Sequence, residues 1–183
     1  PVLADLSAKA LWPTDLMVRD GLQLRIVETN RALSPFPVNP LVIGDNVDML
    51  TSAVGRAYLA FCPPAEHTEL IGQMRRVHGA AALATLPRIL NATRDRGYAV
   101  RAPNCTGGTK RYPALIDNFH AIAVPVLLSG QILCCINLLL RPSAISGAGY
   151  KLRMARILRQ CASEIADNYR MACPAFASHD LNV

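Results

Sequence analysis

The chain has 183 residues, of which 51% are hydrophobic and 17% are charged, and its mean hydropathy is +0.23. A chain of this length and apolar content can bury enough surface to offset its conformational entropy, which excludes a disordered protein and predicts one soluble domain over residues 1–183. The net charge of +6 favours anionic partners, either nucleic acid or acidic metabolites. The longest apolar runs, 121–128 and 132–136, are far shorter than the ~20 residues of a membrane-spanning helix.

The cysteines and arginines narrow the class further. The six cysteines form no C-x-x-C pair and have no histidine at the spacing of a zinc site. We therefore expect free thiols in a reducing cytoplasm and no bound metal. The 16 arginines are scattered and have no interleaved aromatic residues, so direct nucleic-acid binding by this chain is the less favoured interpretation of its charge.

The N-terminal segment predicts a helix followed by a β-hairpin. Residues 2–11 carry apolar side chains at helical spacing. Two strand-like segments, 15–19 and 22–27, flank Asp20-Gly21, and both of these residues tolerate the positive φ of a type I′ turn. An Asp-Gly pair between two such segments is the strongest short-range signal for a hairpin.

An irregular segment and three helices are predicted next. The prolines between residues 32 and 46 remove backbone donors, so we expect at most a short strand there, near 41–43. Capping residues, prolines and a glycine bound the helices that follow. These helices are expected from Thr51 or Ser52 to about Phe61, from Pro64 through Met74, and between Thr85 and Gly97.

The C-terminal half predicts strands and a long helix. Residues 98–101 form a short strand-like segment, and a loop over 103–118 follows. Two almost continuous apolar runs, 119–128 and 131–140, are joined by a Ser-Gly turn and predict a hairpin at the sheet centre, covered on both faces. A helix is predicted over 150–172. This order of elements implies an α+β fold, an antiparallel sheet with helices on one or both faces.

One helix start has the composition of an anion site. Small residues open the helix at Thr51-Ser52-Ala53-Val54-Gly55, where free N–H groups attract carboxylates and small side chains let an anion approach. From the residues alone, an ordinary capped helix with Gly55 for close packing is the simpler interpretation.

The same segment resembles a known family. The run 50–60, Leu-Thr-Ser-Ala-Val-Gly-Arg-Ala-Tyr-Leu-Ala, is similar to the small-small-Gly-Arg/Lys-Ala-x-Leu-Ala signature of the effector-binding domain of IclR-type bacterial transcription regulators. Three more segments match in the same order, 93–100, 121–126 and 136–138, and the resemblance covers about residues 2–172. A weaker match, through Trp12-Pro13, 33–36 and 55–63, is to the branch that controls catabolism of hydroxylated phenylpropionates.

The resemblance implies a GAF/PAS-like α+β domain with a long C-terminal helix that senses a metabolite and builds homodimers or homotetramers. Residues 1–12 would be the end of a linker helix, 13–172 the sensor core and 173–183 a flexible tail. The N-terminal winged helix-turn-helix would be absent from this chain, and operator DNA would be bound only through that domain.

The resemblance also implies an effector site with apolar walls and a few polar groups. The helix start would offer backbone N–H groups to a carboxylate, and an asparagine would face a hydroxyl group. The implied effector-binding residues are Phe36, Ala53, Val54, Arg101, Ala121, Asn137 and Leu139.

Two departures from the family pattern bear on the ligand. Arg101 stands where members that sense short oxo acids tend to have an acidic residue, and a guanidinium suits a larger, aromatic carboxylate, which it can bind through two hydrogen bonds. The alternative interpretation, in which Arg101 is a solvent-exposed residue at the end of a strand with no role in binding, has equal weight. The loop 103–118 is longer than the family pattern by roughly a dozen residues, and long loops are usually functional or mobile.

Catalytic chemistry is not predicted. His120 near Cys105 suggests a thiol with a base, but nothing in the sequence orients the imidazole, and the acidic residues are few and unclustered. We predict no catalytic residue, no metal ligand and no cofactor.

We therefore expect the effector-binding and oligomerisation domain of a cytoplasmic transcription regulator, with an aromatic carboxylate as effector and no membrane partner. Two alternatives to an aromatic-acid sensor stay open. The first is a GAF-like oligomerisation module with a vestigial pocket, and the second is a sensor of a short oxo acid.

Overall fold

The computed structural model describes residues 2–3, 5–6, 11–36, 38, 42–107, 117–145, 147 and 149–173. Its centre is a sheet of six antiparallel strands in the order β3-β2-β1-β6-β5-β4. The strands are β1 (Asp15–Asp20), β2 (Gln23–Thr29), β3 (Asn46–Asp48), β4 (Ala99–Val100), β5 (His120–Leu128) and β6 (Gln131–Leu140). The helices are α2 (Ala53–Phe61), α3 (Pro64–Ala82), α4 (Leu86–Arg96) and α5 (Tyr150–Ala172), with 3₁₀ turns at Arg31–Leu33 and Pro142–Ala144.

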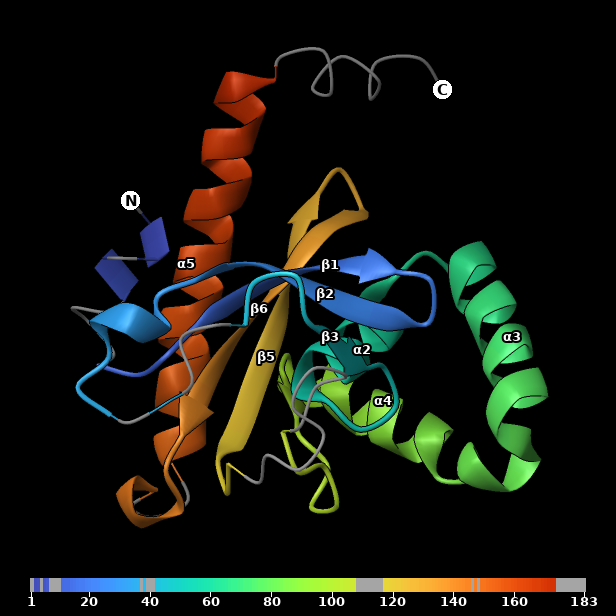
Figure 1. The fold of residues 1–183 in the computed structure, drawn as a ribbon. Coiled ribbons are helices and arrows are strands. Elements are labelled where there is room, and N and C mark those ends of the chain that lie inside the picture. Colours follow the sequence, from blue (N-terminus) through green and yellow to red (C-terminus); the bar gives the residue numbers. More distant parts are fainter. Residues whose placement is uncertain are drawn as a thin grey trace.

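The helices cover both faces of the sheet, as expected from the continuous apolar runs. Helix α5 crosses one face, and α2 and α4 lie on the other (Figure 1). Successive side chains of β5 and β6 alternate between two cores, so Ile136 and Leu138 pack toward α5 while Cys135 and Leu139 pack toward α2. The predicted α+β fold with a long C-terminal helix is confirmed.

Both predicted hairpins are present. Ser129 and Gly130 join β5 to β6 with φ of 51° and 74°, as a type I′ turn requires. In the first hairpin the predicted turn is one residue out of register, because Asp20 pairs with Gln23 and the turn residues are Gly21 and Leu22. A positive φ is found only at Gly21, 61°, which defines a type II′ turn.

The strand expected near 41–43 was placed wrongly. Leu41 lies outside the described residues, and Ile43-Gly44 form a turn in which the Gly44 amide donates to the Ile26 carbonyl at 2.8 Å. Gly44 has a φ of 86°, which turns the chain so that Gly44 and Asp45 bond to β2 only at Ile26, and the paired strand begins at Asn46. The short strand is therefore β3.

The other helix predictions agree with the structure apart from their lengths. Residues 2–3 and 5–6 are helical, and the rest of the predicted helix at 2–11 lies outside the described residues or beyond the helix end. Helix α3 continues past Met74 to Ala82 and contains a break at Gly79, with φ of 78° and ψ of 161°. Gly97 ends α4 in the left-handed conformation, φ 74°, as its position after the helix predicts.

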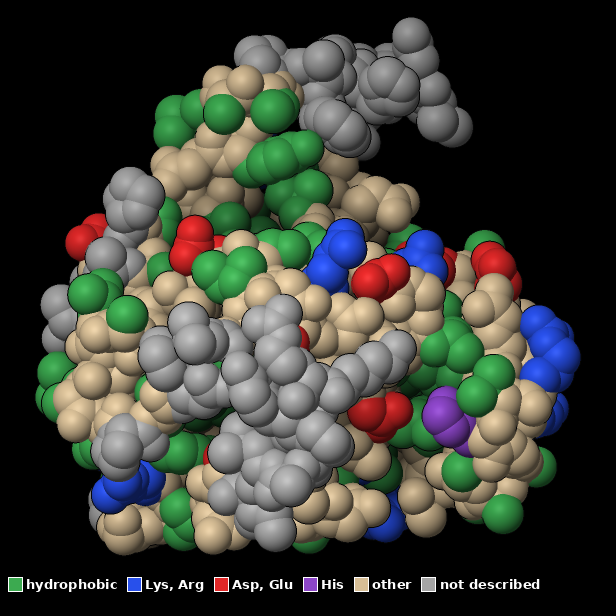
Figure 2. Space-filling view, in the orientation of Figure 1, with side chains coloured by type: hydrophobic (Ala, Val, Ile, Leu, Met, Phe, Trp, Pro, Cys, Tyr) green, Lys and Arg blue, Asp and Glu red, His purple; other side chains and the backbone are tan. Residues whose placement is uncertain are grey.

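Parts of two helices stand clear of the sheet. Helix α3 extends to one side of the domain, and the last turns of α5 rise above it (Figure 1). Hydrophobic side chains gather on this raised part of α5 (Figure 2), and Met171 near its end is 72% exposed. In the described part of the chain no helix is long and apolar enough to cross a membrane.

Helix α2 approaches the preceding turn so closely that only glycine fits at position 55. A Cβ there would overlap the Met49 carbonyl and Cα, which are backbone atoms that cannot move aside. Gly55→Ala is expected to lower the free energy of unfolding by about 1–3 kcal/mol, the usual cost of overpacking. The loss is measured by urea denaturation.

The matched control is Gly72→Ala in α3, where the nearest atom is 3.9 Å away at the end of the Arg76 side chain. This substitution should stabilise the chain by up to about 1 kcal/mol, because alanine is the better helix former. Equal effects of the two substitutions would contradict the close-approach argument.

Burial divides the free cysteines into two classes. Burial raises the pKa of Cys62 to about 11, with a further contribution from Glu66, and raises the pKa of Cys134 to about 12. We expect a disulfide reagent at pH 8 to label half-buried Cys105 and Cys173 first. Peptide mass spectrometry identifies the labelled sites, with the guanidinium-unfolded chain as the control in which all six react. Early labelling of Cys62 or Cys134 would contradict the assignment.

Candidate ligand-binding site

A cavity of about 250 Å³ lies between the start of α2 and the strands β1, β5 and β6. The turn after β3 and the segment after β4 complete its wall. Six of the seven predicted site residues line it: Ala53, Val54, Arg101, Ala121, Asn137 and Leu139. The sheet and α2 thus bring together residues that are up to 86 positions apart, from 53 to 139.

Phe36 does not line this cavity. Its ring stacks on Trp12 with centroids 4.5 Å apart, and the Arg141 guanidinium lies 5.3 Å from its centroid. It packs with the core on the α5 face of the sheet, whereas the cavity is on the α2 face. Sequence order alone could not distinguish the two faces for a residue that belongs to no strand.

The start of α2 presents two free donors at the cavity wall. Ser52 caps the helix by accepting a hydrogen bond from the Gly55 amide at 3.0 Å, and the Arg56 amide donates to the Ser52 carbonyl at 3.2 Å. The amides of Ala53 and Val54 have no partner in the part of the chain that the structure describes. Free first-turn amides and the helix dipole together favour a bound anion.

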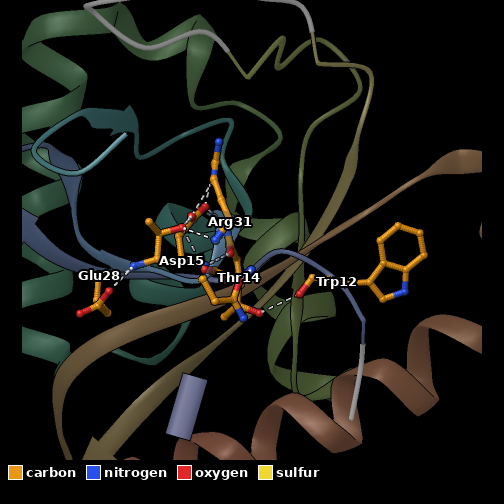
Figure 3. A network of polar contacts seen from close by, with 8 residues as sticks. Trp12, Thr14, Asp15, Glu28 and Arg31 are labelled. Carbon is orange, nitrogen blue, oxygen red and sulfur yellow. Dashed lines mark hydrogen bonds and ion pairs between the residues drawn. The ribbon is translucent and has the colours of Figure 1, made fainter. Parts of the chain in front are cut away.

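A buried ion pair forms another part of the cavity wall. Asp15 is fully buried and makes two 2.8 Å hydrogen bonds to Arg31, from Nε and from Nη2 (Figure 3). Burial alone would lower the pKa of Arg31, but the attraction of Asp15 and its hydrogen bonds outweigh burial and raise it. Thr29 Oγ1 also donates to Asp15, at 2.8 Å.

Asn137 connects this pair to the central strand of the sheet. Its side-chain carbonyl accepts from the Asp15 amide at 2.7 Å, and its Nδ2 donates to Asp15 Oδ2 at 3.2 Å. Asn137 is 4% exposed, so these bonds fix its rotamer. One N–H of Nδ2 remains for a hydroxyl or carbonyl group in the cavity.

Arg101 enters the cavity from the segment after β4. Its Nη1 donates to Asp117 at 2.8 Å and to the Phe119 carbonyl at 2.9 Å, while Nη2 is buried with no hydrogen-bond partner among the described residues. Burial lowers its pKa, but the charge of Asp117 and the neighbouring Cys105 outweigh burial and raise it. A Cβ at Gly107 would overlap both Asp117 and Arg101 Nη2, so glycine is required there. The remainder of the predicted loop, 108–116, lies outside the described residues.

Sequence reasoning missed the acidic residues of the site. Asp15, Asp48 and Asp117 line the cavity, each already bonded to protein groups. For Asp15 a signal existed. It lies two residues before core-facing Met17 in the same strand, so its carboxylate is directed into the core, where a charge needs a partner. Nothing local in the sequence identifies that partner as Arg31.

The described residues contain no group of three or more His, Cys, Asp or Glu side chains that could hold a metal ion. Cys105 lies beside Arg101, and no hydrogen bond among the described side chains joins it to His120. The cavity thus combines apolar side chains with acidic and basic groups, two first-turn amides and one guanidinium nitrogen that have no hydrogen-bond partner among the described residues. Such a combination is typical of small-molecule sites.

Solved structures share this fold. The structure superposes on an IclR family transcriptional regulator from Brucella abortus with a TM-score of 0.72 at 18% identity, over 92% of this chain and 60% of that one. It matches the Thermotoga maritima IclR with a TM-score of 0.69 at 19% identity, over 91% of this chain and 65% of that one. An IclR homologue from Microbacterium hydrocarbonoxydans, complexed with 4-hydroxybenzoate, matches with a TM-score of 0.68 at 19% identity. The match covers 93% of this chain and 66% of that one.

These neighbours are transcriptional regulators, which are not enzymes. The family model described as bacterial transcriptional regulator IclR C-terminal matches residues 1–167. The chain therefore belongs to the family of IclR C-terminal domains. It spans 60% to 66% of the length of the three regulators compared above.

The Asp15–Arg31 pair gives a stability prediction. Asp15→Ala removes a fully buried carboxylate together with the two hydrogen bonds it accepts from Arg31, and should cost about 3–5 kcal/mol of unfolding free energy. Asp167→Ala is the matched control, because its ion pair with Arg170 is more than half exposed, at 57% and 53%, and should change stability by less than about 1 kcal/mol. Urea denaturation of both variants measures the difference. A small effect of Asp15→Ala would show that Arg31 is compensated elsewhere.

Proposed function

We propose that this domain senses an aromatic carboxylate in the cavity at the start of α2 and passes the signal to a DNA-binding domain outside this chain. The observation that carries the proposal is the pair of free amides at Ala53 and Val54, which open onto a cavity lined by both apolar and polar side chains. A carboxylate accepts from both amides with a full negative charge, which the helix dipole favours.

The shape and chemistry of the cavity favour a ligand with one ring. Its volume of about 250 Å³ lies just below the ~300–1,000 Å³ usual for small-molecule sites. Apolar side chains of Met17, Val47, Ala121 and Leu139 line one part of the cavity, where they can contact a ring. The complex of the Microbacterium relative with 4-hydroxybenzoate gives independent support for this class of ligand.

Each polar group of the cavity has a role in this proposal. The carboxylate accepts from the α2 amides, and Arg101 Nη2 is the additional donor, since Nη1 is already bonded to Asp117. Asn137 faces the polar substituent of the ring with its remaining N–H. Phe36, on the other face of the sheet, is not included in this site.

Signalling requires a second arrangement of the regulator with different ligand affinity, because a ligand that binds both arrangements equally shifts nothing. We propose that the exposed hydrophobic part of α5 forms contacts between subunits of a homodimer or homotetramer. The regulator acts in the cytoplasm, and control of aromatic-acid catabolism is the biological role that this ligand class suggests.

A ligand panel tests the proposal. Thermal unfolding and titration calorimetry with 4-hydroxybenzoate, cinnamate, 3-phenylpropionate and pyruvate should show stabilisation by aromatic acids, since ligands that bind only the folded state raise its stability. Stabilisation by pyruvate alone would instead identify a sensor of short oxo acids. Stabilisation by none of them would identify a vestigial pocket and an oligomerisation module.

The contribution of Arg101 is tested separately. Arg101→Ala should weaken binding of the stabilising acid about tenfold, the effect of losing one charge-assisted hydrogen bond. Arg75→Ala, on an exposed part of α3, is the control and should bind normally. Each variant's stability without ligand is measured as well, because Arg101→Ala also leaves Asp117 unpaired. Unchanged affinity in Arg101→Ala would remove this residue from the site.

A further inference from the structure

We propose that a second cavity, on the other side of Arg101, binds a small dianion of the phosphate class. This cavity of about 490 Å³ lies between α2, the segment after β4, the start of β5 and the start of α5. Its described lining contains the basic residues Arg56, Arg101, His120 and Lys151 and no carboxylate. The proposal concerns a site other than the cavity at the start of α2, although Arg101 lines both. Only the alternative in which the anion is a group on the effector rests on the function proposed above.

Arg56 is a buried cation without a carboxylate partner. It is 9% exposed, and its Nε and Nη1 donate to the carbonyls of Leu50 at 2.8 Å and Val100 at 3.1 Å. No carboxylate oxygen among the described residues forms an ion pair with it, and burial lowers its pKa. Burying an uncompensated charge is costly. An anion in the adjoining cavity removes that cost.

Arg101 brings a second buried guanidinium to the same cavity. Its side chain is 6% exposed, and Nη2 has no hydrogen-bond partner in the described part of the chain. Asp117 compensates its charge through Nη1 alone, so Nη2 remains a donor without an acceptor. Such a group is rare in a protein interior and indicates a bound group that supplies the acceptor.

Two further bases lie at the start of β5 and the start of α5. Lys151 is in the first turn of α5, where the helix dipole disfavours a cation and where no acidic residue is present. It forms no ion pair within the described residues. Partial burial and then the charges of Lys151 and Arg101 lower the pKa of His120, in agreement with the basic lining of the cavity.

The charge balance indicates the class of anion. Asp117 pairs with Arg101, whereas Arg56 and Lys151 form no ion pair among the described residues, and Asp48 attracts Arg56 only from beyond ion-pair distance. With His120 neutral, the described lining therefore has an excess of positive charge. A doubly charged oxyanion matches this balance, and its oxygens suit guanidinium and ammonium donors. The group is either a free anion or a phosphate ester on the effector, because Arg101, Cys105 and Ala121 line both cavities.

Inorganic phosphate is the first probe, added to the chain without effector. At constant ionic strength, phosphate is expected to raise the unfolding temperature above its value in chloride and to shift the His120 ring resonances in NMR spectra. Lys151→Glu should weaken phosphate binding about tenfold or more. Arg156→Glu, an equal charge change at an exposed position of the same helix, should leave phosphate binding unchanged.

A second variant guards against a folding defect at the start of α5. His120→Glu adds a negative charge at an exposed position at the start of β5 and should also weaken phosphate binding, with normal circular dichroism. The proposal is overturned if phosphate acts no differently from chloride, or if Lys151→Glu and Arg156→Glu weaken binding equally, since that is a general charge effect.

4-Carboxyphenyl phosphate distinguishes the two sources of the anion. If the group belongs to the effector, Lys151→Glu weakens binding of this phosphate ester but not of 4-hydroxybenzoate. If the anion is free, Lys151→Glu weakens binding of phosphate alone. Either result supports a dianion site. The proposal is overturned if Lys151→Glu weakens binding of neither ligand.

Discussion

The buried ion pair between Asp15 and Arg31 is the constraint on which the cavity depends. Asp15 is on β1, Arg31 follows β2, and Asn137 on β6 is hydrogen-bonded to Asp15. These bonds hold three segments in one register at the point where the sheet faces α2. A carboxylate at full burial is stable only with all its acceptors used, so the pair specifies one arrangement of the surrounding backbone.

Charge compensation differs on the two sides of Arg101. In the cavity at the start of α2 every described acidic side chain is bonded to protein donors, and the remaining donors are amides and one nitrogen of Arg101. In the second cavity the described bases have no acidic neighbour in the lining. The chain as a whole has more basic than acidic residues, and the lining of the second cavity shows the same excess locally.

Local sequence signals predicted the elements whose causes are local. Ser129-Gly130 and Gly97 identified a turn and a helix end, because their backbone conformations depend on the residues themselves. The position of β3 depends on pairing with β2, and the place of Phe36 depends on its stacking with Trp12. Such tertiary contacts leave no local pattern. Six of the effector-binding residues that the family resemblance implies lie around one cavity. Nothing in the sequence predicts that Asp15 pairs with Arg31.

Side chains along β5 and β6 alternate between the cavity on one face of the sheet and the α5 core on the other. Ala121, Asn137 and Leu139 face the cavity, whereas their neighbours Ile122 and Leu138 pack beneath α5. Substitution at a cavity position therefore changes what the domain recognises without removing a side chain from the α5 core. Ligand preference can diverge among descendants of this chain while the scaffold that holds the subunit together stays the same.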